Sequence, residues 1–162
     1  MTVTRIDYQT LLENIRNEIY NGGANLNQNL STSVQQVIYG DPNNIAVAAN
    51  MYPTVFIQLQ GMEEAWETLG SVGSGDGGQK TAAIKFSAFC FVIKSSGSDD
   101  SDKEIRYLAS NIEGLIRNNV RLSNTSNLLW ITPTSTNFVD SWRDGIYLSS
   151  ATMAFECKVD VK

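Results

Sequence analysis

The segment Lys80–Lys94 has the longest strand pattern in the chain and limits the folds that the chain can adopt. Small and apolar residues alternate along one of its faces, at Ala82, Ile84, Phe86, Ala88, Cys90 and Val92. Towards its end the opposite face also becomes apolar, through Phe89, Phe91 and Ile93. A strand that is polar on one side at first and apolar on both sides later enters a core partway along its length. The pattern therefore predicts a long strand that is only partly covered by the body of the molecule.

The residues before this segment predict its partner strand in a hairpin. Pro53 favours an extended backbone, and apolar residues then alternate along Thr54–Gln60. The next segment, Met62–Leu69, is compatible with a strand or a short helix, and its place between two strand-like segments favours the strand. The glycine-rich segment Ser71–Gln79 follows. Together these segments predict a long hairpin with a flexible tip that projects from the body.

The last third of the chain predicts two more strands. The C-terminal segment Ile146–Val161 alternates between apolar and polar residues, as a strand does when one of its faces lies in water. Leu128–Thr132 predicts a short strand that Pro133 interrupts, because proline has no backbone N–H to donate within a sheet. Both strands are expected to join the sheet of the hairpin.

Two segments have the periodicity of amphipathic helices. In Asp7–Tyr20 apolar residues recur at helical spacing, Thr4 is placed to cap the first turn, and a Gly-Gly pair follows as a stop signal. A second helix is expected to begin where Ser101 and Glu104 have the spacing of a capping box, and to end at Asn118-Asn119. The apolar positions are Tyr8, Leu11, Leu12, Ile15 and Ile19 in the first helix, and Ile105, Leu108, Ala109, Ile112, Leu115 and Ile116 in the second.

The order of these elements is helix, strands, helix, strands, which predicts an α+β fold. The expected architecture is an antiparallel sheet with two helices packed on one face and a long projecting hairpin. With 162 residues and a mass of 17.8 kDa the chain has the size of one domain. We therefore expect residues 1–162 to form a single unit.

Residues 21–50 differ in composition from the rest of the chain. Ten of these thirty positions are Asn or Gln, and Asp41 is the one charged residue. Val37, Ile38 and Tyr39 predict a short strand before a turn. A connection of this length is unusual inside a compact domain. Two interpretations stay open, namely an extended arm that covers a neighbouring subunit, or a segment that packs on its own subunit.

The residue types that most catalytic sites use are scarce in this chain. It has no histidine, which excludes Ser-His-Asp triads, Cys-His pairs and histidine-ligated zinc. Its two cysteines, Cys90 and Cys157, fall on the apolar side of predicted strands and are expected to be small buried hydrophobes. A pair so far apart is neither a disulfide framework nor a zinc knuckle. We therefore expect no enzymatic activity, no cofactor and no metal site.

Two acidic clusters do not match catalytic or metal-binding patterns. Glu63 and Glu64 form the one carboxylate pair near an aromatic residue, but neighbours on a strand point to opposite faces and do not converge on a substrate. A hydrolase that uses one of these carboxylates is a minor alternative. Asp99, Asp100 and Asp102 lack the ligand spacing of an EF-hand loop and are better suited to the start of a helix.

The glycine-rich segment does not fit a phosphate-binding loop. It lacks the Gly-Lys-Ser/Thr ending of a P-loop, and no helical pattern follows it. Gly75, Asp76, Gly77 and Gly78 are compatible instead with a hairpin tip that becomes ordered on contact with a partner, or with a tip that is merely flexible.

Charge and hydropathy argue against nucleic acid and membranes as partners. The chain has 12 Lys and Arg against 17 Asp and Glu, a formal net charge of -5. An acidic chain gains no free energy of counterion release on a phosphate backbone. The first residues lack the apolar core of a signal peptide, and no segment approaches 18 apolar residues. We expect a soluble, cytosolic protein with reduced thiols.

Four features occur along nearly the whole chain in a recognisable order. They are an N-terminal amphipathic helix (IDYQTLLENIRNEIYNGG), a strand that starts at Tyr-Pro (MYPTVFIQLQG), a glycine-rich hairpin, and a capped helix followed by a terminal hairpin (FVDSWRDGIYLSSATMAFECKVDV). This layout resembles the tail terminator, or tail completion, proteins of tailed bacteriophages. The Asn/Gln-rich residues 21–50 and the length of the Leu122–Asn137 region are not matched by the resemblance.

The resemblance implies a structural virion protein at the junction of tail and neck, present in the host cytoplasm during assembly. It implies a homo-oligomeric ring, usually of six subunits, that caps the tail tube and joins it to the head connector or neck protein. DNA would pass through such a ring without specific binding, and an acidic balance suits that passage. Under this hypothesis Gly75, Asp76, Gly77 and Gly78 contact the tube, and the strand around Ile38 contacts an adjacent subunit.

Other classes of protein stay open at this point. One is another structural part of a phage, such as a neck or head-closure protein, or the cap of a contractile injection machine. Another is a small monomeric binding module. The measured mass of the assembly separates a monomeric module from a ring.

Overall fold

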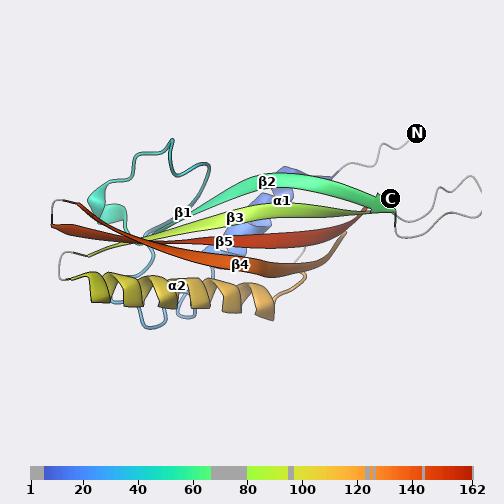
Figure 1. The fold of residues 1–162 in the computed structure, drawn as a ribbon. Helices are drawn as coiled ribbons and strands as arrows, with labels where there is room; N and C mark the ends of the chain where they lie inside the picture. The colour runs from blue at the N-terminus through green and yellow to red at the C-terminus, as the bar shows by residue number, and fades with distance from the viewer. Residues whose placement is uncertain are drawn as a thin grey trace, which may run out of the picture.

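The chain folds into one sheet with two helices, an α+β fold as predicted (Figure 1). The computed structural model describes residues 6–66, 80–94, 97–122, 125, 127–143 and 145–161. The elements follow the order α1 (Tyr8–Tyr20), β1 (Gln36–Tyr39), the 3-10 helix η1 (Ala49–Met51), β2 (Thr54–Trp66), β3 (Lys80–Lys94), α2 (Ser98–Asn118), β4 (Leu128–Arg143) and β5 (Ile146–Val161).

The sheet is mixed, so the prediction of a purely antiparallel sheet is wrong at one edge. Its strands lie in the order β1-β2-β3-β5-β4. β2, β3, β5 and β4 are antiparallel to their neighbours, whereas β1 runs parallel to β2, from Gln36↔Thr54 to Tyr39↔Ile57. The reason is the connection 40–53, which returns along the sheet before β2 begins, so that β1 and β2 point in the same direction.

The strands of the predicted hairpin pair over a long distance. β2 and β3 are antiparallel from Thr54↔Phe91 to Trp66↔Lys80, with a bulge between Leu59 and Gly61. Their paired ends reach beyond the end of α2 (Figure 1). The ambiguous segment after Met62 is a strand as far as Trp66. Residues 67–79, which include the predicted tip, lie outside the described residues, so the projecting hairpin as a whole stays a prediction.

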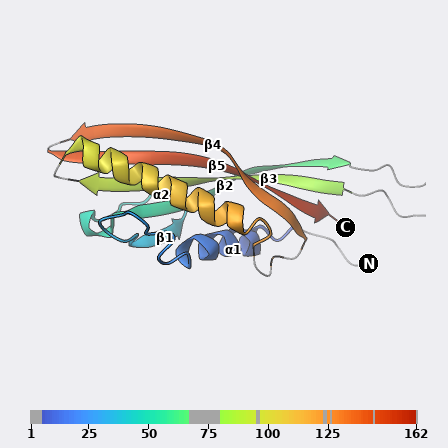
Figure 2. The same ribbon diagram turned by 90° about the horizontal axis from the view of Figure 1, so that it is seen from below.

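Both helices pack on one face of the sheet, and Figure 2 shows α1 beside the C-terminal half of α2. Because alternate residues of a strand point to the same face, β3 and β5 each present an apolar row to these helices. Phe86 of β3 stacks on Phe155 of β5 in this core, with ring centroids 5.0 Å apart. The buried helical residues are Leu11, Ile15 and Ile19 of α1, and Ile105, Leu108, Ala109, Ile112 and Ile116 of α2.

The helix α1 begins with a different cap from the predicted one. Asp7 is its N-cap, and one carboxylate oxygen of Asp7 accepts a hydrogen bond from the backbone N–H of Thr10 at 3.0 Å. Thr4, the predicted cap, lies outside the described residues. Neither described helix combines the length and the hydropathy of a segment that crosses a bilayer.

The helix α2 begins about one turn before the predicted capping box. Asp99 and Asp100 lie in its first turn, where the positive end of the helix dipole favours acidic side chains. Ser101 is buried, and its hydroxyl accepts a hydrogen bond from Ser149 of β5 at 2.9 Å. The two residues of the predicted box are therefore buried inside the helix and bond to other elements, Ser101 to β5 and Glu104 to Lys94 and Ser31, instead of capping the first turn.

The strand β4 is longer than predicted, since it continues through Pro133 to Arg143. A register shift between Pro133 and Ser135 accommodates the proline. β4 is also an edge strand, and a missing backbone N–H costs little where no further strand needs it. The sequence pattern alone did not reveal that this segment lies at an edge.

Part of the Asn/Gln-rich segment is held by its own subunit. Leu26 is buried in the core, and the side-chain amide of Asn111 in α2 donates to the backbone carbonyls of Leu26 and Gln28, at 2.9 and 2.8 Å. Asn27 in turn accepts a hydrogen bond from the backbone N–H of Val34 at 2.8 Å. These bonds dock residues 26–34 beside α2, in agreement with the interpretation in which the segment packs on its own subunit.

The aromatic stack predicts the effect of a core substitution. Replacement of Phe155 by Ala removes the ring that stacks on Phe86 and leaves a cavity, so the free energy of unfolding should fall by about 3–5 kcal/mol. Urea denaturation followed by circular dichroism measures the change. Ser110→Ala at an exposed position of α2 is the control and should change stability by about 0.5 kcal/mol or less. Equal effects of the two substitutions would contradict the assignment of the core.

Candidate functional site

The predicted interface residues of the short strand lie on β1, at one edge of the sheet. Val37 is buried against α1, Ile38 is half-buried and Tyr39 is exposed. Arg16 of α1 donates from Nε to the backbone carbonyl of Val37 at 3.1 Å, which holds β1 against the helix. Of the three residues, Ile38 and Tyr39 therefore contribute side-chain surface, whereas Val37 belongs to the core.

The other predicted interface residues, Gly75, Asp76, Gly77 and Gly78, lie outside the described residues. β1 pairs only with the first residues of β2, up to Ile57.

The outer half of β2 is an exposed sheet edge. The bond from the backbone N–H of Gly40 to the carbonyl of Ile57, at 3.0 Å, is the last one between this edge and the β1 region. From Gln58 to Trp66 no other described strand lies beside β2 on this side. Two apolar side chains on this half, Leu59 and Met62, are each 38% exposed.

The opposite edge of the sheet is β4, and its second half is also exposed. The start of this edge is covered, because the backbone N–H of Ile131 donates to the carbonyl of Val120 at 2.9 Å. From Thr134 to Ser141 the residues are exposed, apart from the half-buried Thr136. Native edge strands usually avoid unwanted pairing through lysines, prolines or short length. Within Thr134–Ser141 there is no lysine or proline; the charge of Asp140 and the register shift after Pro133 are the protections that this edge has.

Phe138 and Val139 are the apolar side chains of this second edge, with exposed fractions of 46% and 62%. The sequence analysis did not name either residue as part of an interface: its strand pattern ended at Pro133, and both residues appeared only in the terminal hairpin of the resemblance (FVDSWRDGIYLSSATMAFECKVDV). The two residues stand next to each other in an otherwise polar stretch, so no alternation of apolar and polar residues marks them. Large apolar side chains at such exposure on an unpaired edge are typical of a surface that another chain covers.

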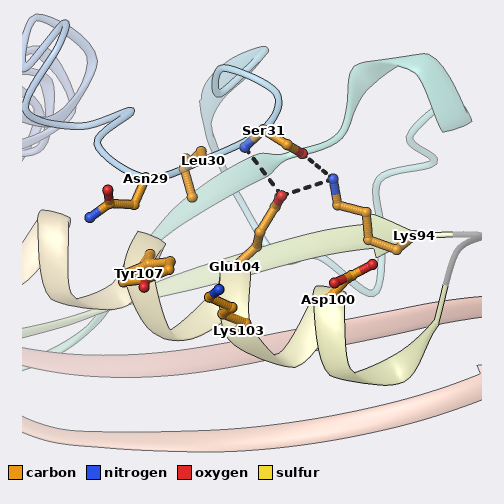
Figure 3. A pocket seen from close by; sticks show the side chains of 8 residues that line it. All are labelled: Asn29, Leu30, Ser31, Lys94, Asp100, Lys103, Glu104 and Tyr107. Atoms are coloured by element: carbon orange, nitrogen blue, oxygen red, sulfur yellow. Dashed lines mark hydrogen bonds and ion pairs between the residues drawn. The ribbon is translucent and has the colours of Figure 1, made fainter.

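A third feature is a pocket of about 600 Å³ between the N-terminal half of α2 and residues 29–31 (Figure 3). The Glu104 carboxylate is at its centre and is only 10% exposed. Its Oε1 accepts from Lys94 Nζ at 2.9 Å and from the backbone N–H of Ser31 at 3.1 Å. Lys94 Nζ also donates to the hydroxyl of Ser31. One carboxylate thus joins α2, the end of β3 and the Asn/Gln-rich segment.

The two glutamates considered for catalysis do not converge. Glu63 pairs with Lys85 at 3.0 Å, and Glu64 pairs with Lys80 at 3.8 Å, each across to β3. Since neighbouring strand residues alternate between faces, the two carboxylates lie on opposite sides of the sheet, as predicted. Both side chains are well exposed, and ion pairs in water contribute little to the free energy of unfolding.

The two cysteines are buried in the core, as predicted. Burial raises the pKa of the Cys90 thiol to about 12. Burial likewise raises the pKa of Cys157 to about 12, with a smaller contribution from the charge of Glu156. Neither thiol forms an appreciable thiolate at neutral pH, so both behave as small hydrophobes. Within the described ranges, no group of three or more potential metal-ligating His, Cys, Asp or Glu residues comes together.

No protein-family model matches the chain, and no curated protein matches it. Among solved structures, the chain is similar to one from "Virion of native gene transfer agent (GTA) particle". The alignment covers 96% of this chain and 99% of that chain, with a TM-score of 0.49 and 10% sequence identity. Similarity of fold at so low an identity does not transfer a function from one chain to another.

The buried ion pair predicts an asymmetry between two lysines that line the same pocket. Lys94→Met leaves the Glu104 carboxylate buried without its cation and should lower the free energy of unfolding by about 3–5 kcal/mol. Lys103→Met, at an exposed position, is the matched control and should change it by less than about 0.5 kcal/mol. Thermal or urea unfolding measures both.

A double variant tests whether the unpaired charge is the cause. Lys94→Met combined with Glu104→Leu leaves no charge in the pocket centre and should recover much of the lost stability. If the double variant is no more stable than Lys94→Met alone, the ion pair does not explain the effect of the lysine.

Proposed function

We propose that this chain is a structural virion protein of a tailed phage or a phage-like particle, and that it acts as a tail terminator. Copies of the chain form a ring, with six subunits as the expected number, that closes the end of the tail tube. Its partners are itself, the tube protein beneath it and the head connector or neck protein above it. It acts through shape, without making or breaking covalent bonds.

The observation that carries the proposal is the pair of exposed sheet edges. A closed ring needs two different surfaces on each subunit that bind head to tail. The outer half of β2 and the second half of β4 are different surfaces on opposite edges of one sheet, and both expose apolar side chains. Exposed edges are suited to assembly, because each offers a row of backbone donors and acceptors to another chain.

The arrangement of the described elements also agrees with the layout on which the resemblance rests. The helix α1 leads the chain, and Tyr52-Pro53 comes directly before β2. β2 and β3 form a long antiparallel pair, and α2 is followed by the β4–β5 pair at the C-terminus. Each feature of the resemblance therefore corresponds to a described element, except the tip of the hairpin.

The proposal predicts the mass and the binding position of the purified protein. Native mass spectrometry should give one main assembly of six 17.8 kDa subunits, and negative-stain electron microscopy should show rings. Added to open-ended tail tubes, the rings should bind at tube ends and stop further growth of the tube. A protein that stays monomeric at high concentration and does not bind tube ends would refute the proposed function.

The predicted hairpin tip gives a second test of the proposal. Deletion of residues 73–78 should leave a folded protein that still forms rings but no longer joins tubes, because those residues are proposed to contact the tube. Lys103→Met, at an exposed position of α2 outside the predicted tip, is the control and should still cap tubes. Unchanged capping by the deletion variant would remove the tip from the tube interface.

A further inference from the structure

We infer that the two exposed edges bind each other between adjacent copies of this chain. The outer half of β2, Gln58–Trp66, of one subunit pairs with the second half of β4, Thr134–Ser141, of the next. This inference rests on the proposed ring and names the contact that builds it. The occupant of each edge is thus a second copy of the chain, joined head to tail.

The strand directions favour this contact. β2 is antiparallel to β3, β3 to β5, and β5 to β4, so β2 and β4 of one subunit run in opposite directions. A second copy placed beside β2 in the same orientation presents its β4 antiparallel to β2. The alternation of directions then continues across the boundary without a break. Antiparallel ladders need no crossover connection and form between separate chains as well as within one.

Three of the exposed apolar side chains, Leu59, Met62 and Phe138, lie on the same face of the sheet, whereas Val139 points to the opposite face. Leu59 and Met62 of β2 are opposite Phe86 and Ile84, whose side chains point into the core beneath the helices. Phe138 of β4 is opposite Ala151, another core residue.

A sheet that continues from one subunit to the next therefore places Phe138 on the same face as Leu59 and Met62 of its neighbour. Contacts between side chains directly across a strand pair stabilise a sheet, and an aromatic side chain with an aliphatic one is a favourable combination. The contact also removes from water the apolar surface that the isolated subunit exposes at both edges.

The offset between the two edges is compatible with a closed ring. Met62 lines up through β3 and β5 with Ile131, whereas the exposed part of β4 is centred near Phe138. When Met62 of one copy lies opposite Phe138 of the next, the second copy is shifted along the strand direction. Counted along β5, from the partner of Ile131 to the partner of Phe138, the shift is about six residues, or roughly 20 Å. The four long strands of each copy, β2, β3, β5 and β4, span roughly 19 Å at right angles to the strand direction. A shift of roughly 20 Å for each 19 Å of width tilts the strands by about 45° to the ring axis. Closed barrels need a stagger of this kind, and their strands tilt by about 35–45°.

Paired lysine variants test the contact, because lysine on an edge prevents strand pairing. One variant, L59K/M62K, blocks the β2 edge, and the other, F138K/V139K, blocks the β4 edge. All four positions are exposed, so both variants should keep the circular dichroism spectrum of the parent. The control S110K/N118K adds the same charge at exposed positions of α2 and should keep the parent's assembly.

The expected result is that each edge variant alone is monomeric in native mass spectrometry, whereas a 1:1 mixture forms a heterodimer. The heterodimer forms because the first variant retains an intact β4 edge and the second an intact β2 edge. It does not grow further, since its remaining edges are blocked. If either variant keeps the parent's assembly, the inference is wrong while the proposed ring can still form through another surface. If L59K/M62K dimerises by itself, β4 pairs with β4, and the head-to-tail contact is also wrong.

Two outcomes concern the parent protein and separate the inference from the proposed function. Open filaments that both edge variants abolish would support the contact and refute the ring, because a head-to-tail contact that does not close gives a filament. A parent that remains monomeric at high concentration would refute both.

Hydrogen exchange tests the contact without any substitution. In the concentrated parent, amides within Gln58–Trp66 and Thr134–Ser141 should exchange about tenfold or more slowly than in a dilute monomeric sample. Amides at the covered start of β4, such as that of Ile131, should exchange at similar rates in both samples, because that N–H is already bonded to Val120. Equal exchange of both edge segments in the two samples would overturn the inference even if the lysine variants do not fold.

Discussion

The pairing of β3 on both of its sides is the interaction on which the rest of the structure depends. β3 pairs with β2 from Lys80 to Phe91 and with β5 along its whole length. From Lys80 to Phe91 its backbone therefore has a neighbouring strand on both sides, so the donors and acceptors of this stretch are paired while its apolar face packs under the helices. Phe86 stacks on Phe155 where this face meets β5. Because the central strands are paired on both sides, the unpaired backbone groups of the sheet lie at its two edges.

Those edges link the fold to the proposed function. β1 is too short to cover β2 beyond Ile57, and the connection that follows α2 covers β4 only near Ile131. A monomer would have to leave the backbone groups of both remaining stretches to water, together with the exposed side chain of Phe138. In the proposed ring a single kind of contact, repeated at each subunit boundary, covers both stretches.

The ion pair between Lys94 and Glu104 gives the Asn/Gln-rich segment a fixed place. Buried carboxylates are costly unless a cation and further donors compensate them. Here the cation comes from the end of β3, and another donor is the backbone N–H of Ser31. With the bonds that Asn111 makes to the same segment, this pocket holds residues 26–31 beside α2. The polar composition of the segment thus serves hydrogen bonds within the subunit.

Local periodicity determined which segments are helices and strands, because the spacing of apolar residues is set by the geometry of each element. It predicted α1, the strands around Phe86 and Phe155, and the burial of Cys90 and Cys157. The tertiary structure alone decided which strands become edges, since edge or centre depends on how distant segments pair. For that reason the parallel β1, the continuation of β4 past Pro133 and the exposure of Phe138 were not predictable from the pattern. The partner of Glu104 was not predictable either. Its spacing from Ser101 indicated a helix cap, whereas its ion pair with Lys94 depends on where the end of β3 lies in the fold.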